Sequence, residues 1–370
     1  MNRKKDKICF INNYSPHYRK EIFMLMEREL SCDFYFGDKM GDVKKIDFSL
    51  LKNFKKEVQN IIICKPIYYQ KGVIFLLFKG YSKFILYGEH VCVSSWIFLF
   101  LAKIFRKEVY LWTHGYYGKE SKFRLFFERI FYSMPKGVML YGNYAKNLMR
   151  KDGLNEKKLH VIYNSLAYDK QIKIRNNITS TDIFQNHFEN NYHNLIFVGR
   201  LTKVKQLDML LKALCELNKH TKQYNLTLIG KGEMENDLLL LAKELNIEKN
   251  IWFYGASYDE QVLSKLIYNA DLCISPGNVG LTAIHAMTYG CPVITHDNFA
   301  WQMPEFEAIK KGKTGDFFKY NNLDSLIETI QNWFQLNLER EKVCQNCYEE
   351  IDSKWNPYYQ LGVMKKVMGL

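Results

Sequence analysis

The sequence has no apolar run long enough to cross a membrane. Its most apolar window, residues 91–105, covers 15 residues and includes Lys103, whereas a spanning helix needs about 20 apolar residues. Residues 1–7 are basic, but only Ile8–Ile11 are apolar before two asparagines follow, so no signal peptide is predicted. We therefore expect a cytoplasmic protein.

A disulfide framework and a metal-binding motif are also absent. The nine cysteines are scattered along 370 residues, a pattern typical of free thiols in a reducing compartment. Cys344 and Cys347 form one CxxC pair on a predicted helix, and no second pair completes a zinc site. No DxD-like motif follows a strand of the second half. We expect no bound metal.

Charge is unevenly distributed along the chain. Residues 1–180 contain 33 Lys and Arg against 16 Asp and Glu, a net charge of +17. Residues 181–370 contain 19 Lys and Arg against 23 Asp and Glu, a net charge of −4, so that the whole chain carries +13. A basic first half predicts that one domain meets a polyanion and the other does not.

Three segments of the basic half, residues 72–83, 94–107 and 122–132, are rich in aromatics and edged by Lys or Arg. Such faces suit a membrane surface with anionic lipids. Alternatively, they are core helices whose cationic ends meet the helix dipole. Basic aromatic segments would also allow nucleic-acid binding, but no recognised motif for it is present. We expect an anionic membrane surface as a partner, and no nucleic acid.

Short apolar strands alternate with helical segments throughout. Strands are predicted at residues 7–11, 32–36, 61–64, 85–87, 109–112 and 138–141, and again at 194–199, 226–229, 251–254, 271–275 and 292–295. This alternation predicts parallel sheets wound by helices, and the chain length predicts two domains. The polar, Asn-rich stretch before residue 194 is the best boundary. The first strand–loop–helix unit lacks the glycines of a dinucleotide fingerprint.

Residues suited to a phosphate follow successive strands of the second domain. Arg200 and Lys205 lie in one strand-to-helix loop and could direct both cations at a diphosphate. Gly230 and Gly232 follow the next strand and would let backbone approach a ligand. Residues 278–281 open a helix whose free N–H groups and dipole suit an anion. Because the carboxyl ends of parallel strands share one edge, we expect these features to lie together.

From Asn194 to about Tyr320, the sequence resembles the C-terminal domain of GT-B glycosyltransferases, especially family 4, the retaining sugar-nucleotide transferases. The matching pieces are FVGRL with Lys205, LIGKGE (228–233), FYGA (253–256), YNADLCISP (268–276), G…HAMTYGCPVI (280–294) and MPE…GKTG (303–315). The first half resembles the acceptor-side domain only loosely, and Lys354-Trp355 resembles the start of the terminal helix that crosses back in that fold.

The resemblance implies an α/β GT-B fold, in which two Rossmann-like doubly wound domains face a central cleft. The expected divisions are an acceptor-side domain at 1–166, a linker at 167–193, a nucleotide-sugar domain at 194–350 and a crossing helix at 351–370.

The resemblance also implies roles for single residues. The family's Arg and Lys that match Arg200 and Lys205 bind the donor diphosphate, as does backbone near Gly280 and Leu281. A histidine beside the transferred sugar, the catalytic candidate, is best matched by His114. The donor-side candidates are Arg200, Lys205, Gly230, Gly232, Asn278, Gly280, Leu281, His285, His296 and Glu305.

One departure from the family concerns two glutamates eight positions apart. By spacing, their positions hold Gly277 and His285. His285 can still hydrogen-bond a hydroxyl, whereas Gly277 has no side chain, so sugar contacts are expected from Asn278, His296 or backbone. Alternatively, each candidate histidine has a purely structural role and does not contact a ligand.

These observations predict a retaining glycosyltransferase of the hexosyltransferase type (EC 2.4). It would move a sugar from a UDP- or GDP-linked donor to a lipid-linked glycan acceptor in surface polysaccharide, capsule or lipopolysaccharide synthesis. The expected location is the inner face of the membrane, as a peripheral protein. The alternatives are a sugar-nucleotide epimerase of the same fold and a non-catalytic GT-B module that binds membrane.

Overall fold

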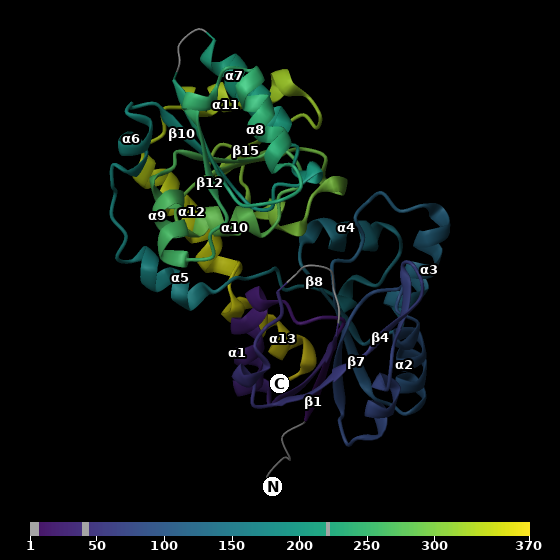
Figure 1. Ribbon diagram of the computed structural model, residues 1–370. Helices are drawn as coiled ribbons and strands as arrows, with labels where there is room; N and C mark the ends of the chain where they lie inside the picture. The colour runs from purple at the N-terminus through teal and green to yellow at the C-terminus, as the bar shows by residue number, and fades with distance from the viewer. Residues whose placement is uncertain (1–6, 39–43, 220–222) are drawn as a thin grey trace. The chain divides into compact units, whose positions relative to one another are not determined.

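The computed structural model describes residues 7–38, 44–219 and 223–370. They form two compact units, one made of the chain up to Ala167 together with Asn356–Leu370, the other of Tyr168–Trp355 (Figure 1). Each unit is a parallel sheet with helices on its faces. The fold is therefore α/β, with two Rossmann-like halves, as the sequence predicted.

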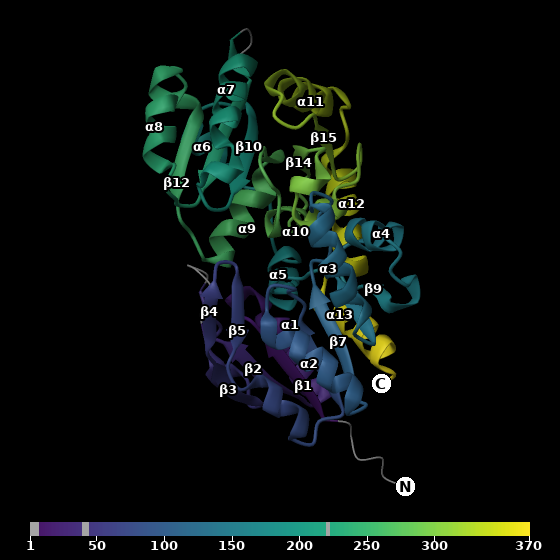
Figure 2. The same cartoon turned by 90° about the vertical axis from the view of Figure 1, so that its right-hand side faces the viewer.

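The first unit contains a seven-stranded sheet of order β3-β2-β1-β6-β7-β8-β9, parallel throughout. Its strands are β1 (Ile8–Asn12), β2 (Cys32–Gly37), β3 (Phe54–Val58), β6 (Lys83–Tyr87), β7 (Glu108–Thr113), β8 (Gly137–Leu140) and β9 (Leu159–Val161). The strand predicted at 61–64 does not join this sheet. It is β4 (Asn60–Cys64) of an antiparallel hairpin with β5 (Ile67–Gln70) (Figure 2).

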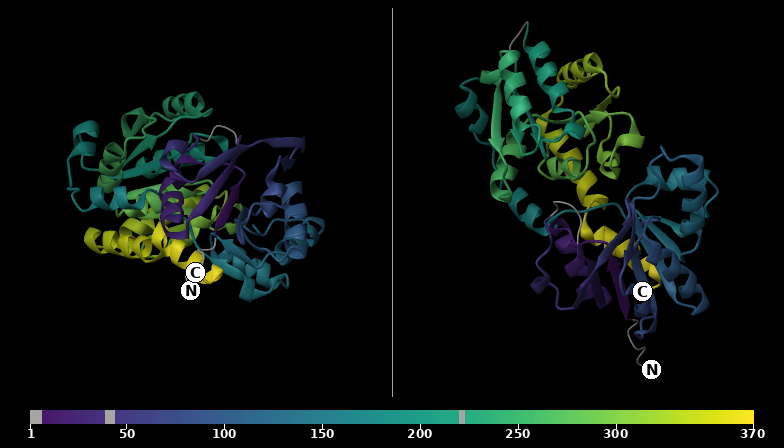
Figure 3. Two further views of the ribbon diagram at one scale, coloured as in Figure 1. Left: turned by 90° about the horizontal axis from the view of Figure 1, so that it is seen from below. Right: turned by 45° about the vertical axis from the view of Figure 1, so that its right-hand side comes forward.

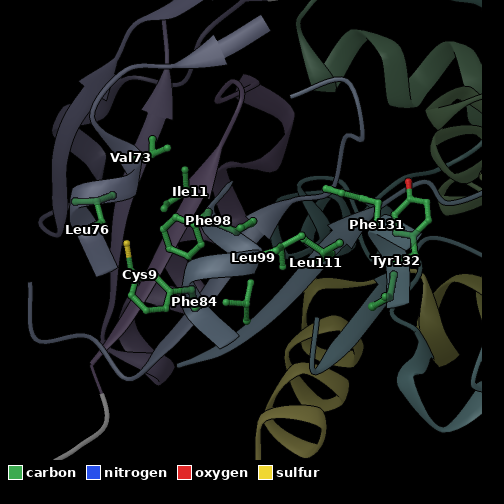
Figure 4. Packing of buried hydrophobic residues seen from close by; sticks show 14 of the residues in the cluster. Cys9, Ile11, Val73, Leu76, Phe84, Phe98, Leu99, Leu111, Phe131 and Tyr132 are labelled. Carbon is green, nitrogen blue, oxygen red and sulfur yellow. The ribbon is translucent and has the colours of Figure 1, made fainter. Parts of the chain in front are cut away.

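Two hydrophobic clusters cover the two faces of this sheet, because alternate residues of a strand point to opposite sides. Cys9 and Ile11 of β1 contribute to one cluster, and Ile8 and Phe10 to the other. Figure 4 shows the first cluster, where Phe98 packs against Phe84 with ring centroids 5.0 Å apart.

The helices of this unit are α1 (Lys20–Leu30), α2 (Val93–Ile104), α3 (Lys122–Ser133), α4 (Asn143–Lys151) and α13 (Pro357–Met368), with 3-10 turns η1 (His17–Arg19), η2 (Phe48–Leu50), η3 (Val73–Phe78) and η4 (Glu156–Lys158). The helical segment predicted at 72–83 is only η3, since Gly72 and Gly80 adopt positive φ at its two sides. Helix α13, yellow in Figure 3, packs against α1.

The second unit contains a six-stranded parallel sheet of order β12-β11-β10-β13-β14-β15. Its strands are β10 (His193–Val198), β11 (Tyr224–Ile229), β12 (Ile251–Gly255), β13 (Leu272–Ser275), β14 (Val293–His296) and β15 (Gly315–Phe318). Its helices are α5 (Tyr168–Arg175), α6 (Ile183–Phe188), α7 (Leu207–Asn218), α8 (Glu235–Glu244), α9 (Glu260–Asn269), α10 (Leu281–Thr288), α11 (Leu323–Gln335) and α12 (Arg340–Lys354), with 3-10 turns η5 (Lys203–Lys205), η6 (Glu248–Asn250), η7 (Phe299–Trp301) and η8 (Pro304–Ala308).

The stretch expected as a linker, residues 167–193, contains α5 and α6, and both belong to the second unit. Arg175 fastens α5 through an ion pair with Asp352 on α12, with an N–O distance of 2.7 Å. The crossing helix expected over 351–370 is divided in two. Asn356 caps α13 by accepting from Tyr359 N at 2.9 Å, and Pro357 at the first helical position cannot continue α12.

Each sheet has a point at which the order of its strands reverses. In the second unit the chain builds β11 and β12 on one side of β10, and then crosses to place β13 on the other side. In the first unit the same reversal lies between β1 and β6. Loops that follow the strands at such a point diverge and leave a crevice, which is where open α/β sheets bind ligands.

In the second unit, Gly277 lets the loops after β10 and β13 touch. Its N–H donates to Lys205 O at 3.0 Å. A Cβ at this position would lie 2.0 Å from Val204 O and 2.7 Å from Lys205 Cα. The position that the family spacing assigns to a glutamate is therefore filled by backbone in this chain.

We predict that Gly277→Glu destabilises the second unit by about 2 kcal/mol or more, because both loops must move to admit a side chain. The measurement is the midpoint of thermal unfolding. Gly362→Glu, at an exposed position of α13, is the matched control, since nothing lies within 4 Å of its Cβ position. An unchanged midpoint for Gly277→Glu would contradict the packing described.

Candidate functional site

Lys205 joins the two loops that flank the reversal point of the second sheet. Its ammonium donates to Asn278 O at 2.6 Å and to Asn278 Oδ1 at 2.9 Å. Burial and the nearby charge of Arg200 lower the pKa of Lys205 to about 8, against an opposing effect of Glu305. A pKa near 8 leaves Lys205 mainly protonated at pH 7, so the loops are held by a cation.

Arg200 adds a second cation at the same edge. Its side chain is exposed, and no ion pair to it is found across residues 7–38, 44–219 and 223–370. Because its charge acts on Lys205, the two groups are neighbours. Arg200 is available to an anion, for which a planar guanidinium offers two parallel donors.

Helix α10 begins beside these cations. Its N-cap, Gly280, makes no side-chain capping hydrogen bond, and Thr282 Oγ1 donates to Val198 O at 2.8 Å, which ties the first turn to the end of β10. Leu281 opens the helix and is half-buried. Amides at an uncapped helix N-terminus attract an anion. The predicted phosphate-suited elements therefore gather at one sheet edge.

Gly230 and Gly232 serve the packing of the chain on itself. A Cβ on Gly230 would lie 1.8 Å from Gly199 O, and one on Gly232 would lie 2.3 Å from Leu201 O. The backbone that approaches these glycines is that of the loop after β10. Their close approach holds that loop, and with it Arg200, against the end of β11.

His285 pairs with a carboxylate that the sequence reading overlooked. Its Nε2 lies 2.8 Å from Glu260 Oε1, which also accepts from Tyr289 OH at 2.7 Å and Gln171 Nε2 at 3.0 Å. Burial alone would raise the pKa of Glu260, but the contacts with His285 and the other donors hold it at about 2. In the sequence, Glu260 indicates only the beginning of a helix, because no local pattern shows that α9 packs beside α10.

His296 and Glu305 are both buried at the ends of their elements. Nδ1 of His296 accepts from Asn298 N at 3.2 Å, and burial lowers the pKa of His296 to about 4, so the ring is neutral. Gln302, another residue not foreseen, donates to His296 O at 3.0 Å and accepts from Val279 N at 2.7 Å. Through Gln302 the loop after β14 supports the loop after β13.

In the first unit, His114 follows β7. Burial and the charge of Arg19 lower the pKa of His114 to about 3, so the imidazole is neutral. Its ring centroid lies 4.7 Å from that of Tyr141. Its Nδ1 is buried and has no hydrogen-bond partner among the residues that the structure describes. Since Nδ1 is buried, a hydrogen bond between the neutral ring and a sugar hydroxyl would have to involve Nε2.

Glu89, just after β6, was also missed. Its Oε2 accepts from Tyr68 OH at 2.7 Å and from Asn13 Nδ2 at 3.2 Å. Burial raises the pKa of Glu89 above the ordinary value for a glutamate. The sequence signal was a Gly-Glu-His tripeptide directly after a predicted strand, which is where functional residues of wound sheets cluster.

The aromatic segments of the first unit carry large exposed apolar side chains. They are Phe75 and Phe78 on η3, Ile97, Phe100 and Ile104 on α2, Phe105 just after α2, and Phe123, Phe126, Phe127 and Ile130 on α3. Their other faces are core, as Phe98 and Phe131 show. Within the described ranges, no helix is long and apolar enough to span a membrane, and no three His, Cys, Asp or Glu side chains gather as a metal site.

Comparison with known proteins agrees with this geometry. The model of the family glycosyl transferases group 1 matches residues 179–350. The chain is 24% identical over 320 residues to an uncharacterized 41.2 kDa protein in the cps region of Klebsiella pneumoniae, a match covering 81% of each protein.

Two solved structures share the fold over the whole chain. Anabaena HepE in complex with UDP superposes with a TM-score of 0.73 at 14% identity, covering 98% of this chain and 100% of that one. The lipopolysaccharide outer core galactosyltransferase WaaB, in its apo form, superposes with a TM-score of 0.70 at 16% identity. The match covers 98% of this chain and 99% of that one. The chain therefore has the GT-B fold in two Rossmann-like halves, and its second unit matches the family glycosyl transferases group 1.

Proposed function

We propose that the protein is a retaining hexosyltransferase that takes a sugar from a UDP- or GDP-linked donor to a lipid-linked glycan acceptor. The product would be a surface polysaccharide, capsule or lipopolysaccharide, and the enzyme would work at the inner face of the membrane. The observation that carries the proposal is the convergence of Arg200, Lys205 and the N-terminus of α10 at the reversal point of the second sheet.

These groups suit the departure of a nucleoside diphosphate. Breaking the bond between the sugar and the diphosphate places negative charge on the leaving oxygen, and fixed cations and amides stabilise that charge in the transition state. Lys205 is already held by Asn278, so little reorganisation is needed. Because the chain provides this charge itself, we propose that transfer needs no divalent metal.

The remaining candidates have supporting roles in this proposal. His285, hydrogen-bonded to Glu260, would hold hydroxyls of the donor nucleotide. His114 would hydrogen-bond the transferred sugar. Support for a uridine nucleotide comes from HepE, whose structure contains UDP, and support for surface polysaccharide comes from the cps-region relative.

We predict that Arg200→Ala combined with Lys205→Ala weakens binding of UDP or GDP, whichever the wild type binds, by about 50-fold or more, since two charged hydrogen-bonding groups are lost. Isothermal calorimetry measures the change. Lys203→Ala, in the same 3-10 turn but exposed, is the matched control and should bind normally. Equal affinity of the double variant and the wild type would refute the donor site.

We predict that His114→Phe lowers the turnover number about tenfold, the loss expected when one hydrogen bond to the sugar is removed in the transition state. Affinity for the nucleotide should stay unchanged, because the nucleotide is held by the second unit. Steady-state kinetics and calorimetry separate the two. A normal turnover number would assign His114 a structural role only.

His114 also predicts a pH dependence of stability. The pKa of His114 is about 3 in the folded chain and about 6.5 in the unfolded chain. Between these two values only the unfolded chain binds the proton. The free energy of unfolding therefore falls by up to about 1.4 kcal/mol for each pH unit below about 6.5. Stability from this group is full above pH 6.5 and is lost as the pH falls toward 3. Urea unfolding between pH 7 and 4 should show a shallower loss for His114→Gln, whereas the exposed His17→Gln should follow the wild type.

The membrane part of the proposal rests on the exposed aromatics of η3, α2 and α3. Phe75, Phe100 and Phe123 are 59–76% exposed, in a half of the chain that carries +17. We predict that the full chain floats with vesicles of anionic lipid at low salt, and that the triple change of these residues to Ser abolishes flotation. Tyr258→Ser, at an 88% exposed aromatic of the second unit, is the control. Wild-type protein that remains in the dense bottom fraction would contradict the membrane proposal.

A further inference from the structure

A cavity in the first unit lies beside the reversal point of its sheet. It has a volume of about 210 Å³ and is lined by Asn13, Asn60, Ile62, Lys65, Pro66 and Tyr68. Asn13 directly follows β1, and Asn60 and Tyr68 belong to the β4–β5 hairpin. The hairpin is fixed over the end of β1, since Gln70 Nε2 donates to Asn12 O at 3.2 Å. The cavity therefore occupies the crevice position of this sheet.

The polar groups of the cavity are held in place and retain unused hydrogen-bonding capacity. Tyr68 OH and Asn13 Nδ2 both donate to Glu89 Oε2. The phenol of Tyr68 also hydrogen-bonds the side chain of Cys92, whereas Asn13 keeps its carbonyl oxygen and one N–H for a ligand. In the described ranges no group donates to Oδ1 of Asn13.

The frame around these groups is closely packed. Asn60 Nδ2 donates to Asn13 O at 2.8 Å, and a Cβ on Gly37 would lie 2.0 Å from that same oxygen. Asn60 N also donates to Asp38 Oδ1 at 2.9 Å. Asn13, Gly37 and Asp38 therefore pack closely against the hairpin, and a preformed site lowers the entropic cost of binding.

The chemistry of the lining selects a class of ligand. Amide and phenol groups offer both donors and acceptors, whereas Ile62 and Pro66 offer aliphatic surface. A sugar ring presents hydroxyls at its edge and C–H groups on its faces, and fits both kinds of wall. A phosphate would find one lysine, Lys65, and no helix N-terminus among the lining residues.

We propose that this cavity binds one neutral sugar ring of the glycan acceptor, with Asn13 and Tyr68 contacting its hydroxyls and Glu89 positioning both. The proposal rests on the proposed glycosyl transfer for the identity of the ligand as acceptor, but the binding itself does not require an intact donor site. Glu89 acts through the two side chains that it holds, so it is a positioning residue.

Saturation-transfer NMR on the full-length protein tests the site with methyl glycosides of neutral hexoses, 6-deoxyhexoses and N-acetylhexosamines as probes. We expect at least one glycoside to bind the wild type. Tyr68→Phe and Asn13→Ala should each weaken that binding by about tenfold, the loss of one hydrogen-bonding group. Tyr69→Phe is the matched control, because Tyr69 is next to Tyr68 on the same strand and does not line the cavity. Binding of no glycoside, or equal binding by Tyr68→Phe and wild type, overturns the proposal.

Glu89 is tested by conservative rescue. Glu89→Gln keeps an oxygen that accepts from Tyr68 and should retain binding, whereas Glu89→Ala should lose it as Tyr68→Phe does. Equal loss in both variants, or in neither, would contradict a positioning role.

The donor variant Arg200→Ala with Lys205→Ala separates this proposal from the proposed function. It should keep glycoside binding and lose nucleotide binding, and the cavity variants should show the reverse. Loss of the glycoside signal in the donor variant alone would place the sugar in the donor site and overturn the subsite.

Discussion

The contact between the Lys205 ammonium and Asn278 holds the candidate donor site together. It bridges the loops after β10 and β13, which diverge from the point where the strand order of the sheet reverses. The same two loops are also joined by the hydrogen bond from Gly277 N to Lys205 O. Burial and the charge of Arg200 lower the pKa of Lys205, and Glu305 opposes them. A lysine in this balance stays cationic near neutral pH and is still partly desolvated, which strengthens its attraction for an anion.

The chain differs from the expected family pattern at two positions of the candidate donor site, and the structure shows what surrounds each of them. Gly277 carries no carboxylate because the backbone of residues 204–205 occupies the space where its side chain would begin. At His285 a carboxylate is present after all, contributed by Glu260 from the neighbouring helix α9. Charge and hydrogen-bonding capacity therefore reach this part of the site from a different element. The pair is buried and satisfied by Tyr289 and Gln171, which keeps the glutamate ionised despite its desolvation.

The polar groups at the two sheet edges differ in chemical character. The second has cations and an uncapped helix N-terminus at its sheet edge, whereas the corresponding edge of the first has amides, a phenol and a neutral histidine. The same first unit exposes aromatics along η3, α2 and α3, so its surface combines apolar and basic character.

The sequence by itself determined the alternation of strands and helices, and hence two wound α/β halves, because buried parallel strands are short apolar runs that need no distant information. It also predicted that Arg200, Lys205 and the start of α10 lie together, since each stands in a loop that follows a strand and parallel strands bring their ends to one edge. The features that depend on packing between distant elements became clear only from the tertiary structure. The run at residues 61–64 has the composition of a core strand, yet it forms an exposed hairpin because its neighbour β5 pairs with it. Glu260 and Glu89 became candidates only when folding placed them beside His285 and Tyr68, which lie 25 and 21 residues away. Gly230 and Gly277 gained their roles in the same way, since the space around a glycine is defined by the loops that pack against it.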